Sequence, residues 1–282
     1  MKVDEAFSAL KSNLEITAAE RDLVKDRHAL IRAHIRDRWE LTDDFLTGSY
    51  ARHTKTKKLK DVDIFVVIDP DGPQGDLRGG TGTAALDALA DILGTRWTVM
   101  VDVNVVRIDY AAEEVASYEI APAFEKSGHY EIPNGAAWMS TDPRIHAAEV
   151  TAKNAACAEK FVPLVKMIKS INRHAGDPIS PSFLLEVMAL DLIDAPVGGY
   201  PDEVRYFLAS AADAFDRDWP DPAGLGPAVN AGISAYDRGR LADVIRGWQE
   251  QAEYALRLGN AGRDSAAIGA WRELFGSRMP AA

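Results

Sequence analysis

The chain has 282 residues, which is enough for one large domain or for two modest domains with hydrophobic cores of their own. Apolar residues make up 47% of it and charged residues 27%, which is the composition of an ordinary soluble globular protein. The formal net charge of −11 argues against a protein that coats nucleic acid without sequence preference, because such proteins neutralise phosphates with a cationic excess. We therefore expect no broad nucleic-acid binding.

Three further features of the sequence bear on where the protein works. Cys157 is the only cysteine, which excludes an internal disulfide and a cysteine-based zinc site. The N-terminal stretch MKVDEAFSALKSNLE carries acidic residues and has no apolar core, so we expect no signal peptide. No apolar run reaches the roughly 18 residues that a membrane span needs. These features predict a cytoplasmic protein that makes no membrane contact.

Helical and strand patterns alternate in the first half of the chain. Thr17 followed by Glu20 has the form of a capping box, and apolar residues recur after it at helical spacing. Asp61 opens an apolar run that is typical of a buried strand. In chain order, the expected elements are helices at 4–14 and 17–38, a turn at 48–49, a basic polar stretch at 52–60, a strand at 61–68, a loop rich in glycine and proline at 70–82, a short helix at 86–93, and strands at 99–110 and 115–121.

From about Pro143 onward the patterns are almost entirely helical. We predict helices at 144–172 (kinked at Pro163), 182–194, 201–215, 226–234, 236–258 and 262–275. The predicted fold is therefore α+β, with a mixed sheet and flanking helices in a catalytic core at 1–145 and a helical lobe at 146–282. Clefts between two such lobes are common ligand sites, so we expect a bilobal molecule with a central cleft.

Asp61 and Asp63 carry the strongest chemical signal in the sequence. Carboxylates at positions i and i+2 of a strand project from the same face, where their negative charges repel each other. A bound cation resolves this repulsion. Oxygen ligands with no histidine or cysteine nearby suit Mg²⁺ or Mn²⁺, and Mg²⁺ in turn accepts phosphate oxygens from a substrate. The pair therefore predicts a nucleotide substrate and two catalytic metal ions.

Gly48 and Ser49 complement the acidic pair. Glycine lets the backbone approach a phosphate closely, and the serine hydroxyl and the backbone N–H groups can donate hydrogen bonds to it. Taken alone, a Gly-Ser pair is most often an ordinary surface turn, and Asp-x-Asp is most often an acidic start of a strand. Their combination in this order, with a basic stretch between them and an apolar strand behind them, is much more specific.

Residues 48–68, GSYARHTKTKKLKDVDIFVVI, resemble the signature of DNA polymerase β-type nucleotidyltransferases, in which Gly-Ser precedes two acidic residues one position apart. More narrowly, the chain resembles the bacterial CD-NTases. These are relatives of animal cyclic GMP–AMP synthase and oligoadenylate synthetase, and they make cyclic or linear oligonucleotide second messengers, often in antiphage defence. The likeness continues in YEIAPAF at 118–124, IPNGAAWMSTDP at 132–143, LVKMIK at 164–169, SFLLE at 182–186 and WRELFG at 271–276. It implies a polymerase β-like core followed by a helical bundle.

The resemblance also implies a third carboxylate on a neighbouring strand. By motif position this residue is Glu119, three residues before Pro122. The family usually has aspartate there, so the glutamate is a departure from its pattern. Asp102, in VMVDVNVV, is the alternative third acid. The third acid would act as a metal ligand or as a general base toward the attacking hydroxyl.

Lys169 and Ser182 take the triphosphate-binding role in the resemblance, together with Gly48 and Ser49. A lysine supplies a point cation for phosphates, and a serine at a helix start supplies a hydroxyl and backbone N–H donors. Considered without the resemblance, Lys169 is a solvated helix lysine and Ser182 an N-cap. The basic residues between 52 and 60 either guide triphosphates or form a solvated loop.

These patterns predict a CD-NTase-like cyclic oligonucleotide synthase. In this hypothesis Asp61, Asp63 and Glu119 hold Mg²⁺, with Mn²⁺ as a possible substitute. A ribose hydroxyl of one nucleoside triphosphate attacks the α-phosphate of another, releasing pyrophosphate, and repetition closes a cyclic di- or trinucleotide. ATP is an expected substrate. The product would act on an effector protein that responds to cyclic nucleotides, as in CBASS antiphage signalling.

Two alternatives stay open. A nucleotidyltransferase with the same metal site could modify an RNA 3′ end, a protein or a small-molecule acceptor. A non-catalytic nucleotide-binding sensor is the second alternative, and the departure at Glu119 is the feature that keeps it open. The sequence does not specify the bases, the linkage or the ring size of a product, nor the activation mechanism or the oligomeric state.

Overall fold

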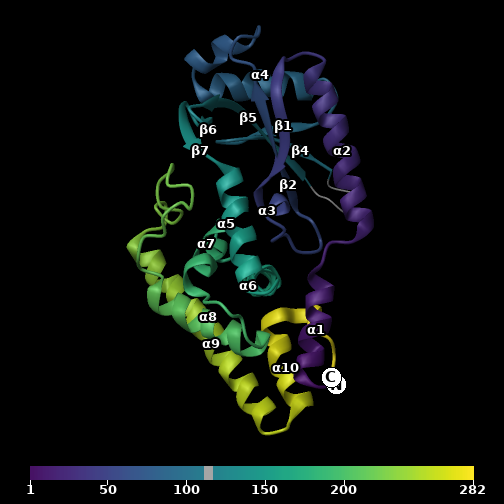
Figure 1. Ribbon diagram of the computed structural model, residues 1–282, viewed down its shortest axis with the longest axis vertical. Helices are drawn as coiled ribbons and strands as arrows, with labels where there is room; N and C mark the ends of the chain where they lie inside the picture. The colour runs from purple at the N-terminus through teal and green to yellow at the C-terminus, as the bar shows by residue number, and fades with distance from the viewer. Residues whose placement is uncertain (111–116) are drawn as a thin grey trace. The chain divides into compact units, whose positions relative to one another are not determined.

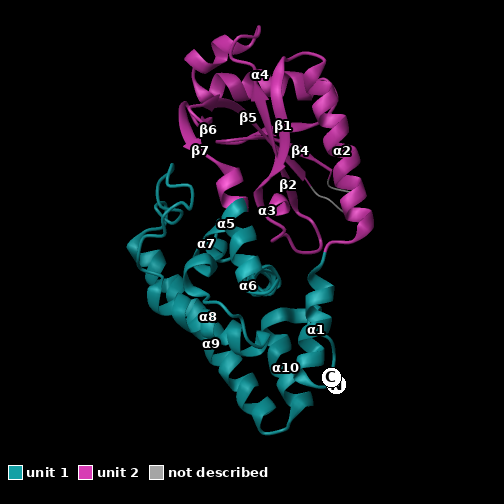
Figure 2. Cartoon of the chain, viewed as in Figure 1, with its two compact units in different colours: residues 1–15, 148–282 teal, residues 16–147 magenta. Residues whose placement is uncertain are grey.

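The computed structural model describes residues 1–110 and 117–282 (Figure 1). The chain folds into two compact units, which we describe separately (Figure 2). The sheet unit is Ile16–Ala147, and the helical unit consists of Met1–Glu15 and Ala148–Ala282. The second stretch of the helical unit begins close to the predicted domain boundary at 145. Residues 1–15, however, which we assigned to the catalytic half, pack with the C-terminal helices.

The sheet unit is built around a mixed sheet whose strands lie in the order β1-β2-β5-β4-β3. Strands β2 and β5 pair in parallel, whereas the other neighbours pair antiparallel. Strand β5 extends into a second antiparallel sheet with β6 and β7. The elements are α2 (Ala18–Arg36), β1 (Leu41–Thr47), α3 (Gly48–Ala51), β2 (Asp61–Ile68), η1 (Gly75–Gly79), α4 (Gly82–Gly94), β3 (Val99–Val101), β4 (Val106–Asp109), β5 (Ser117–Lys126), β6 (His129–Asn134) and β7 (Ala137–Thr141). This mixed sheet with flanking helices confirms the predicted fold class, while the central cleft stays a prediction.

The side chains of β2 alternate between two buried faces of the sheet. Val62, Ile64, Val66 and Ile68 are fully buried in a core that includes apolar residues of α2 and α4. On the opposite face, Phe65 and Val67 belong to a smaller apolar cluster with residues of β5 and β6. Because successive side chains of a strand point to opposite faces, residues 61 and 63 share the second face, beside that cluster.

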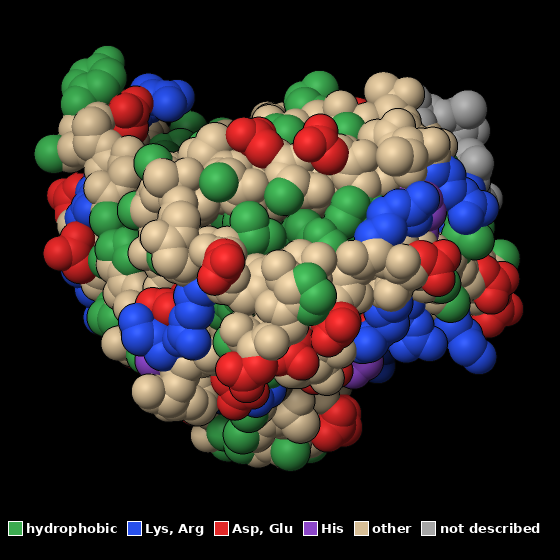
Figure 3. Space-filling model, turned by 90° about the horizontal axis from the view of Figure 1, so that it is seen from above, with side chains coloured by type: hydrophobic (Ala, Val, Ile, Leu, Met, Phe, Trp, Pro, Cys, Tyr) green, Lys and Arg blue, Asp and Glu red, His purple; other side chains and the backbone are tan. Residues whose placement is uncertain are grey.

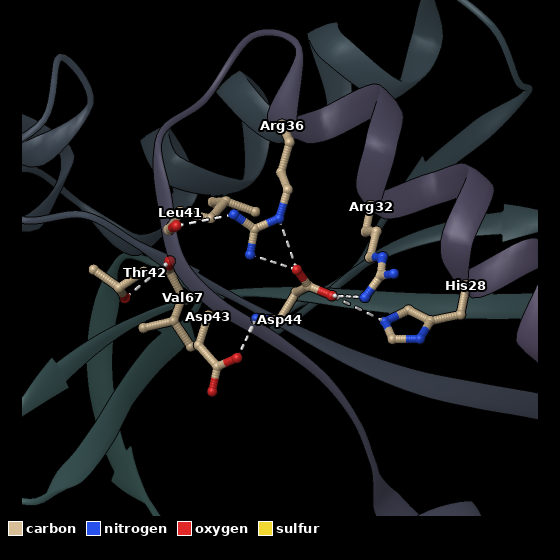
Figure 4. A network of polar contacts seen from close by, with 8 residues as sticks. All are labelled: His28, Arg32, Arg36, Leu41, Thr42, Asp43, Asp44 and Val67. Atoms are coloured by element: carbon tan, nitrogen blue, oxygen red, sulfur yellow. Dashed lines mark hydrogen bonds and ion pairs between the residues drawn. The ribbon is translucent and has the colours of Figure 1, made fainter.

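Asp44 of β1 forms ion pairs with side chains of helix α2 (Figure 4). Its carboxylate is only 3% exposed and accepts two hydrogen bonds from Arg36, at 2.8 Å from Nε and 2.6 Å from Nη2. Arg32 and His28 lie beside the other oxygen, at 3.4 and 3.5 Å. Burial lowers the pKa of His28, so the two guanidinium groups supply the positive charge at neutral pH. This network holds the strand that leads directly into Gly48.

Glu20 connects the start of α2 to the segment in front of β2. It forms the predicted capping box with Thr17: the Glu20 N–H donates to Thr17 Oγ1 at 3.1 Å, and the Thr17 N–H donates to Glu20 Oε2 at 2.7 Å. The Leu59 N–H donates to Glu20 Oε1 at 3.4 Å. The basic stretch is therefore anchored to α2 two residues before the acidic pair begins.

The helical unit packs around one apolar core to which all of its α-helices contribute. Phe7 shows why the N-terminal residues belong here: its ring meets Trp271 edge-on at 5.0 Å and Phe275 at 5.8 Å. Helix α5 begins in the sheet unit and continues into the helical unit. The elements are α1 (Val3–Leu14), α5 (Pro143–Ala156), α6 (Phe161–His174), α7 (Phe183–Leu192), α8 (Tyr200–Ala214), α9 (Ala235–Asn260), α10 (Asp264–Phe275) and η2 (Gly276–Arg278).

Several predicted strands need correction. Neither strand β1 nor the hairpin of β6 and β7 was predicted. The predicted strand 99–110 is two strands, β3 and β4, because the chain reverses between them. Strand β5 runs on to Lys126, beyond the predicted end at 121, and the predicted positions 115–116 lie outside the described residues.

Two predicted helices also differ from the structure. The helix predicted at 144–172 is divided into α5 and α6, and Pro163 lies in the first turn of α6 and makes no kink. Proline is tolerated there because its missing N–H would have no partner within the helix. Residues 226–234 form turns, because the buried Asn230 side chain bonds backbone groups instead: it accepts the Trp219 N–H at 3.0 Å and donates to the Arg217 carbonyl at 2.9 Å.

The surface carries both basic and acidic side chains, as expected from a sequence with 32 lysine and arginine and 43 aspartate and glutamate residues. On the face in Figure 3, lysine and arginine side chains gather in small groups between acidic ones. Within residues 1–110 and 117–282, every helix is too short or too polar to cross a lipid bilayer.

The packing of Phe7 predicts that Phe7→Ala destabilises the helical unit. Removing a buried ring that contacts two aromatic neighbours is expected to lower the free energy of unfolding by about 3–5 kcal/mol. Urea denaturation followed by far-ultraviolet circular dichroism measures this change. Ser8→Ala, at an exposed position of the same helix, is the control and should change the value by less than about 0.5 kcal/mol. Equal stability of both variants would contradict the placement of α1.

Candidate active site

The register of β2 and β5 brings three carboxylates together. Asp63 lies directly opposite Glu119 in the parallel pair, and Asp61 lies opposite Ser117. Each of the three acids offers one oxygen, and these oxygens all lie within 4.8 Å of one another. All three side chains are half-buried. The parallel pairing therefore places the third acid predicted from the resemblance beside the first two.

The electrostatics of this acidic cluster are unfavourable without a cation. Burial, Asp63 and Asp61 together raise the pKa of Glu119 to about 7. Lys55 and Arg107 act in the opposite direction, but they only partly offset this rise. Glu119 is thus about half protonated at neutral pH when no metal is bound, which shows how strongly the three carboxylates compete for positive charge.

Gly48 lies in direct contact with the acidic cluster. Its φ angle of +61° is in the left-handed region, and a Cβ atom at this position would lie 1.8 Å from Asp63 Oδ2. Both facts require glycine, the first because of backbone strain and the second because of the close approach of the carboxylate. Ser49 follows in the short helix α3, and its carbonyl accepts the N–H groups of Thr54 and Lys55 at 3.0 and 3.1 Å. The predicted turn and the predicted acids therefore form one assembly.

Lys55 forms an ion pair with the acidic cluster. The sequence did not distinguish this lysine from the other members of the basic stretch. Its Nζ donates to Asp61 Oδ2 at 2.7 Å, and its side chain is only 11% exposed. Other members of the stretch are buried as well, including Arg52, whereas His53, Lys58 and Lys60 are exposed. Within this segment, Lys55 therefore contacts the site, while the exposed members are solvated.

Arg107 is a second cation next to the acids. It lies directly opposite Glu119 in the antiparallel pairing of β4 and β5. Its Nε lies 3.0 Å from Asp109 Oδ1. Asp102, the alternative third acid, lies in the connection between β3 and β4, and its Oδ1 accepts the Val103 N–H at 2.7 Å. Strand β3 is at the far edge of the sheet, two strands beyond β5. The structure thus brings Glu119 and not Asp102 to the acidic pair.

Lys169 and Ser182 lie in the helical unit. The Lys169 Nζ lies 2.7 Å from Oε1 of Glu186, which is 1% exposed, so its ammonium is held between α6 and α7. Ser182 occupies the N-cap position of α7, but its side chain makes no capping hydrogen bond. The interpretation of Lys169 as a solvated lysine therefore does not describe this residue, whereas Ser182 does occupy the N-cap position. Their triphosphate-binding role stays a prediction.

The donor set of the acidic cluster fits a hard divalent cation. Three carboxylate oxygens within 4.8 Å match the ligand preference of Mg²⁺ and Mn²⁺. Gly48 lets the Asp63 carboxylate lie against the turn, and the raised pKa of Glu119 reports a site with too little positive charge. The three acids therefore fit a divalent metal ion.

Comparison with known proteins agrees with this chemistry. Residues 1–154, more than half of the chain, match the family model described as the Second Messenger Oligonucleotide or Dinucleotide Synthetase domain, SMODS. A curated relative, a probable cyclic nucleotide synthase of Bacillus cereus strain VD146, is 24% identical, and the match covers 83% of this chain and 81% of the relative.

Solved structures show the same fold at low sequence identity. CdnC of Escherichia coli MS115-1, determined with ATP, superposes with a TM-score of 0.75 at 19% identity over 99% of each chain. CdnG of Bradyrhizobium diazoefficiens, a CD-NTase determined in complex with GTP, gives a TM-score of 0.77 at 15% identity over 98% of this chain and 96% of that one.

The raised pKa of Glu119 predicts how stability depends on pH without metal. The folded state holds the Glu119 proton up to about pH 7, whereas an unfolded chain releases it near pH ~4.3. The stabilising contribution is complete below the unfolded pKa and is lost as the pH rises through the folded one. With allowance for solvent screening, wild type should lose about 1–2 kcal/mol more than Glu119→Gln between pH 5.5 and 8. Urea denaturation in EDTA measures this, and identical pH dependence would contradict it.

Gly48→Ala tests the contact with Asp63. The substitution introduces both a strained φ and a clash with the carboxylate, so we expect weaker Mn²⁺ binding as well as a loss of about 1–3 kcal/mol of stability. Gly128→Ala is the matched control, since Gly128 has a φ of +86° but no atom within 4 Å of the added Cβ. It should lose stability and keep its Mn²⁺ affinity, measured by electron paramagnetic resonance. Unchanged Mn²⁺ affinity in Gly48→Ala would refute the contact.

Proposed function

The chain belongs to the family of second messenger oligonucleotide or dinucleotide synthetases, which makes it a nucleotidyltransferase, and we propose that it joins nucleoside triphosphates into a cyclic di- or trinucleotide with the help of Mg²⁺. ATP is proposed as one of its substrates. The observation that carries this proposal is the acidic cluster of Asp61, Asp63 and Glu119, whose oxygens converge within 4.8 Å on a face beside the Gly48-Ser49 turn.

In the proposed reaction the three acids hold the metal. Bound there, Mg²⁺ would activate the attacking ribose hydroxyl and stabilise the charge on the departing pyrophosphate, with Mn²⁺ as a possible substitute. The new bond joins the ribose oxygen to the α-phosphorus, and the bond from the α-phosphorus to the bridging oxygen breaks. The hydroxyl gives up its proton as this bond forms, and Glu119 of the acidic cluster is proposed to receive it.

The remaining predicted residues are proposed to bind the triphosphate. Gly48 lets the turn lie directly against the Asp63 carboxylate, and the backbone N–H groups and the Ser49 hydroxyl of this turn are proposed to bind a phosphate. Lys169 and Ser182 would contact the β- and γ-phosphates from the helical unit. An ammonium has three donor positions, so the ion pair of Lys169 with Glu186 is compatible with a phosphate contact and fixes the lysine in place.

A cyclic nucleotide product implies a protein that responds to it. We propose that the product acts on a cyclic-nucleotide-responsive effector in the cytoplasm, in antiphage signalling of the CBASS type. This part of the proposal is supported by the sequence resemblance and by the second-messenger description of the family.

The direct test is product analysis. We expect wild type, incubated with all four nucleoside triphosphates and Mg²⁺ or Mn²⁺, to form a cyclic oligonucleotide and pyrophosphate, detected by mass spectrometry. Asp63→Asn removes one ligand of the acidic cluster and should lower the rate by about 100-fold or more. Asp91→Asn, at an exposed position of α4, is the control and should retain the rate.

Other outcomes would point to the alternatives. An acceptor molecule enlarged by one nucleotide, with no cyclic product, would indicate transfer to an RNA, a protein or a small molecule. Binding of a nucleoside triphosphate that depends on Asp63, with no release of pyrophosphate under any metal condition, would indicate a sensor.

A further inference from the structure

Lys55 links the phosphate-binding turn to the acidic cluster through its backbone and its side chain. Its N–H donates to the Ser49 carbonyl at 3.1 Å, while its Nζ donates to Asp61 Oδ2 at 2.7 Å. The chain between these residues is held as well, because the Thr54 N–H donates to the same carbonyl at 3.0 Å. The turn therefore holds the backbone of Lys55, and Asp61 holds its ammonium.

The ion pair between Lys55 and Asp61 is sheltered from solvent. The lysine side chain is 11% exposed and that of Asp61 is 34% exposed, so water competes weakly for the ammonium. Charge-assisted hydrogen bonds of this kind are stronger than neutral ones. Lys55 also acts on Glu119, whose pKa it lowers. In the protein without metal, Lys55 thus supplies part of the positive charge that the acids lack.

We propose that Lys55 is a further nucleotide-binding residue, whose ammonium holds Asp61 in the metal-free protein and transfers to a phosphate oxygen when metal and nucleotide bind. This inference rests on the proposed function, since it assumes that the acidic cluster binds a metal together with a nucleoside triphosphate. It adds a role for one member of the basic stretch, which the sequence left undecided between guiding triphosphates and forming a solvated loop.

The exchange follows from the charges. A divalent cation held by Asp61 would lie close to the ammonium, and like charges at short range repel each other. The metal therefore competes with Lys55 for the same carboxylate. A triphosphate brings negative oxygens to the same place, and a lysine anchored next to Ser49 can bind them without leaving the site. The ammonium opposes the metal alone and favours the metal together with the nucleotide.

This mechanism predicts opposite effects on two affinities. In Lys55→Met, Mn²⁺ alone should bind about 3- to 10-fold more tightly, because the competing cation is gone. A non-hydrolysable ATP analogue, added at saturating Mn²⁺, should bind about tenfold more weakly, because a charged hydrogen bond is lost. Lys55→Arg keeps the charge and should bring both affinities back toward wild type. A residue with only a structural role would weaken both.

The experiment combines Mn²⁺ titration, followed by electron paramagnetic resonance, with calorimetric titration of α,β-methylene ATP. Lys58→Met removes a charge from an exposed position of the same segment and should leave both affinities within about twofold of wild type. Unchanged or weaker Mn²⁺ binding in Lys55→Met, or unchanged analogue binding, overturns the inference. If Lys55→Met does not fold, the folded Lys55→Arg decides the matter: loss of analogue binding in this charge-preserving variant would overturn the inference.

Asp63→Asn separates this inference from the proposed function. If wild type binds Mn²⁺ and Asp63→Asn does not, the acidic cluster is a metal site and the Lys55 variants judge the exchange alone. If Mn²⁺ binding is absent or insensitive to Asp63→Asn, the proposed function fails, and the role of Lys55 fails with it.

Discussion

Mutual repulsion among Asp61, Asp63 and Glu119 is the constraint on which the site depends, and strand pairing keeps it in place. At an effective dielectric constant of about 20, two unit charges some 4–5 Å apart repel each other by about 3–4 kcal/mol. Slipping β2 by one residue would move Asp61 and Asp63 away from Glu119, but it would also turn every side chain of β2 to the other face. Val62 and Ile64 are buried on one face and Phe65 on the other, so the slip is opposed by both apolar clusters.

Two cationic side chains and one glycine next to the acids reduce this repulsion or accommodate the carboxylates. Gly48 allows the Asp63 carboxylate to lie against the turn, Lys55 donates to Asp61, and Arg107 faces Glu119 from the next strand. Gly48 and Lys55 lie between β1 and β2 whereas Arg107 lies in β4, so their convergence depends on the pairing of the sheet. The Asp44 network is part of this arrangement, since it fixes β1 against α2 and so determines where Gly48 enters the site.

The sequence predicted the parts of the site whose signals are local. Asp61 and Asp63 on one face follow from the period of a strand, and the capping box at Thr17 follows from two side chains three residues apart. Strand β1 was missed because its sequence, LTDDFLT, places two aspartates in a strand, and Asp44 at its centre is stabilised by Arg36 and Arg32 of helix α2. The ion pair of Lys55 with Asp61 depends on how the turn after Ser49 folds, which no spacing rule specifies. Likewise, α1 joins α10 through contacts between opposite ends of the chain.

Glu119 departs from the aspartate that the resemblance leads one to expect, and this departure was the reason to consider a sensor without turnover. In the structure the additional methylene does not remove the carboxylate from the cluster, because Glu119 stands directly opposite Asp63 in the strand pair. Glu119 is therefore a member of the cluster despite this departure, and burial and the two aspartates raise its pKa to about 7. A metal ion bound there would have to displace this proton as well as the Lys55 ammonium. Three repelling acids reduce the stability of a protein that never binds a cation, and neutral side chains of similar size would relieve it. An intact cluster of this kind is an argument for a site that binds metal.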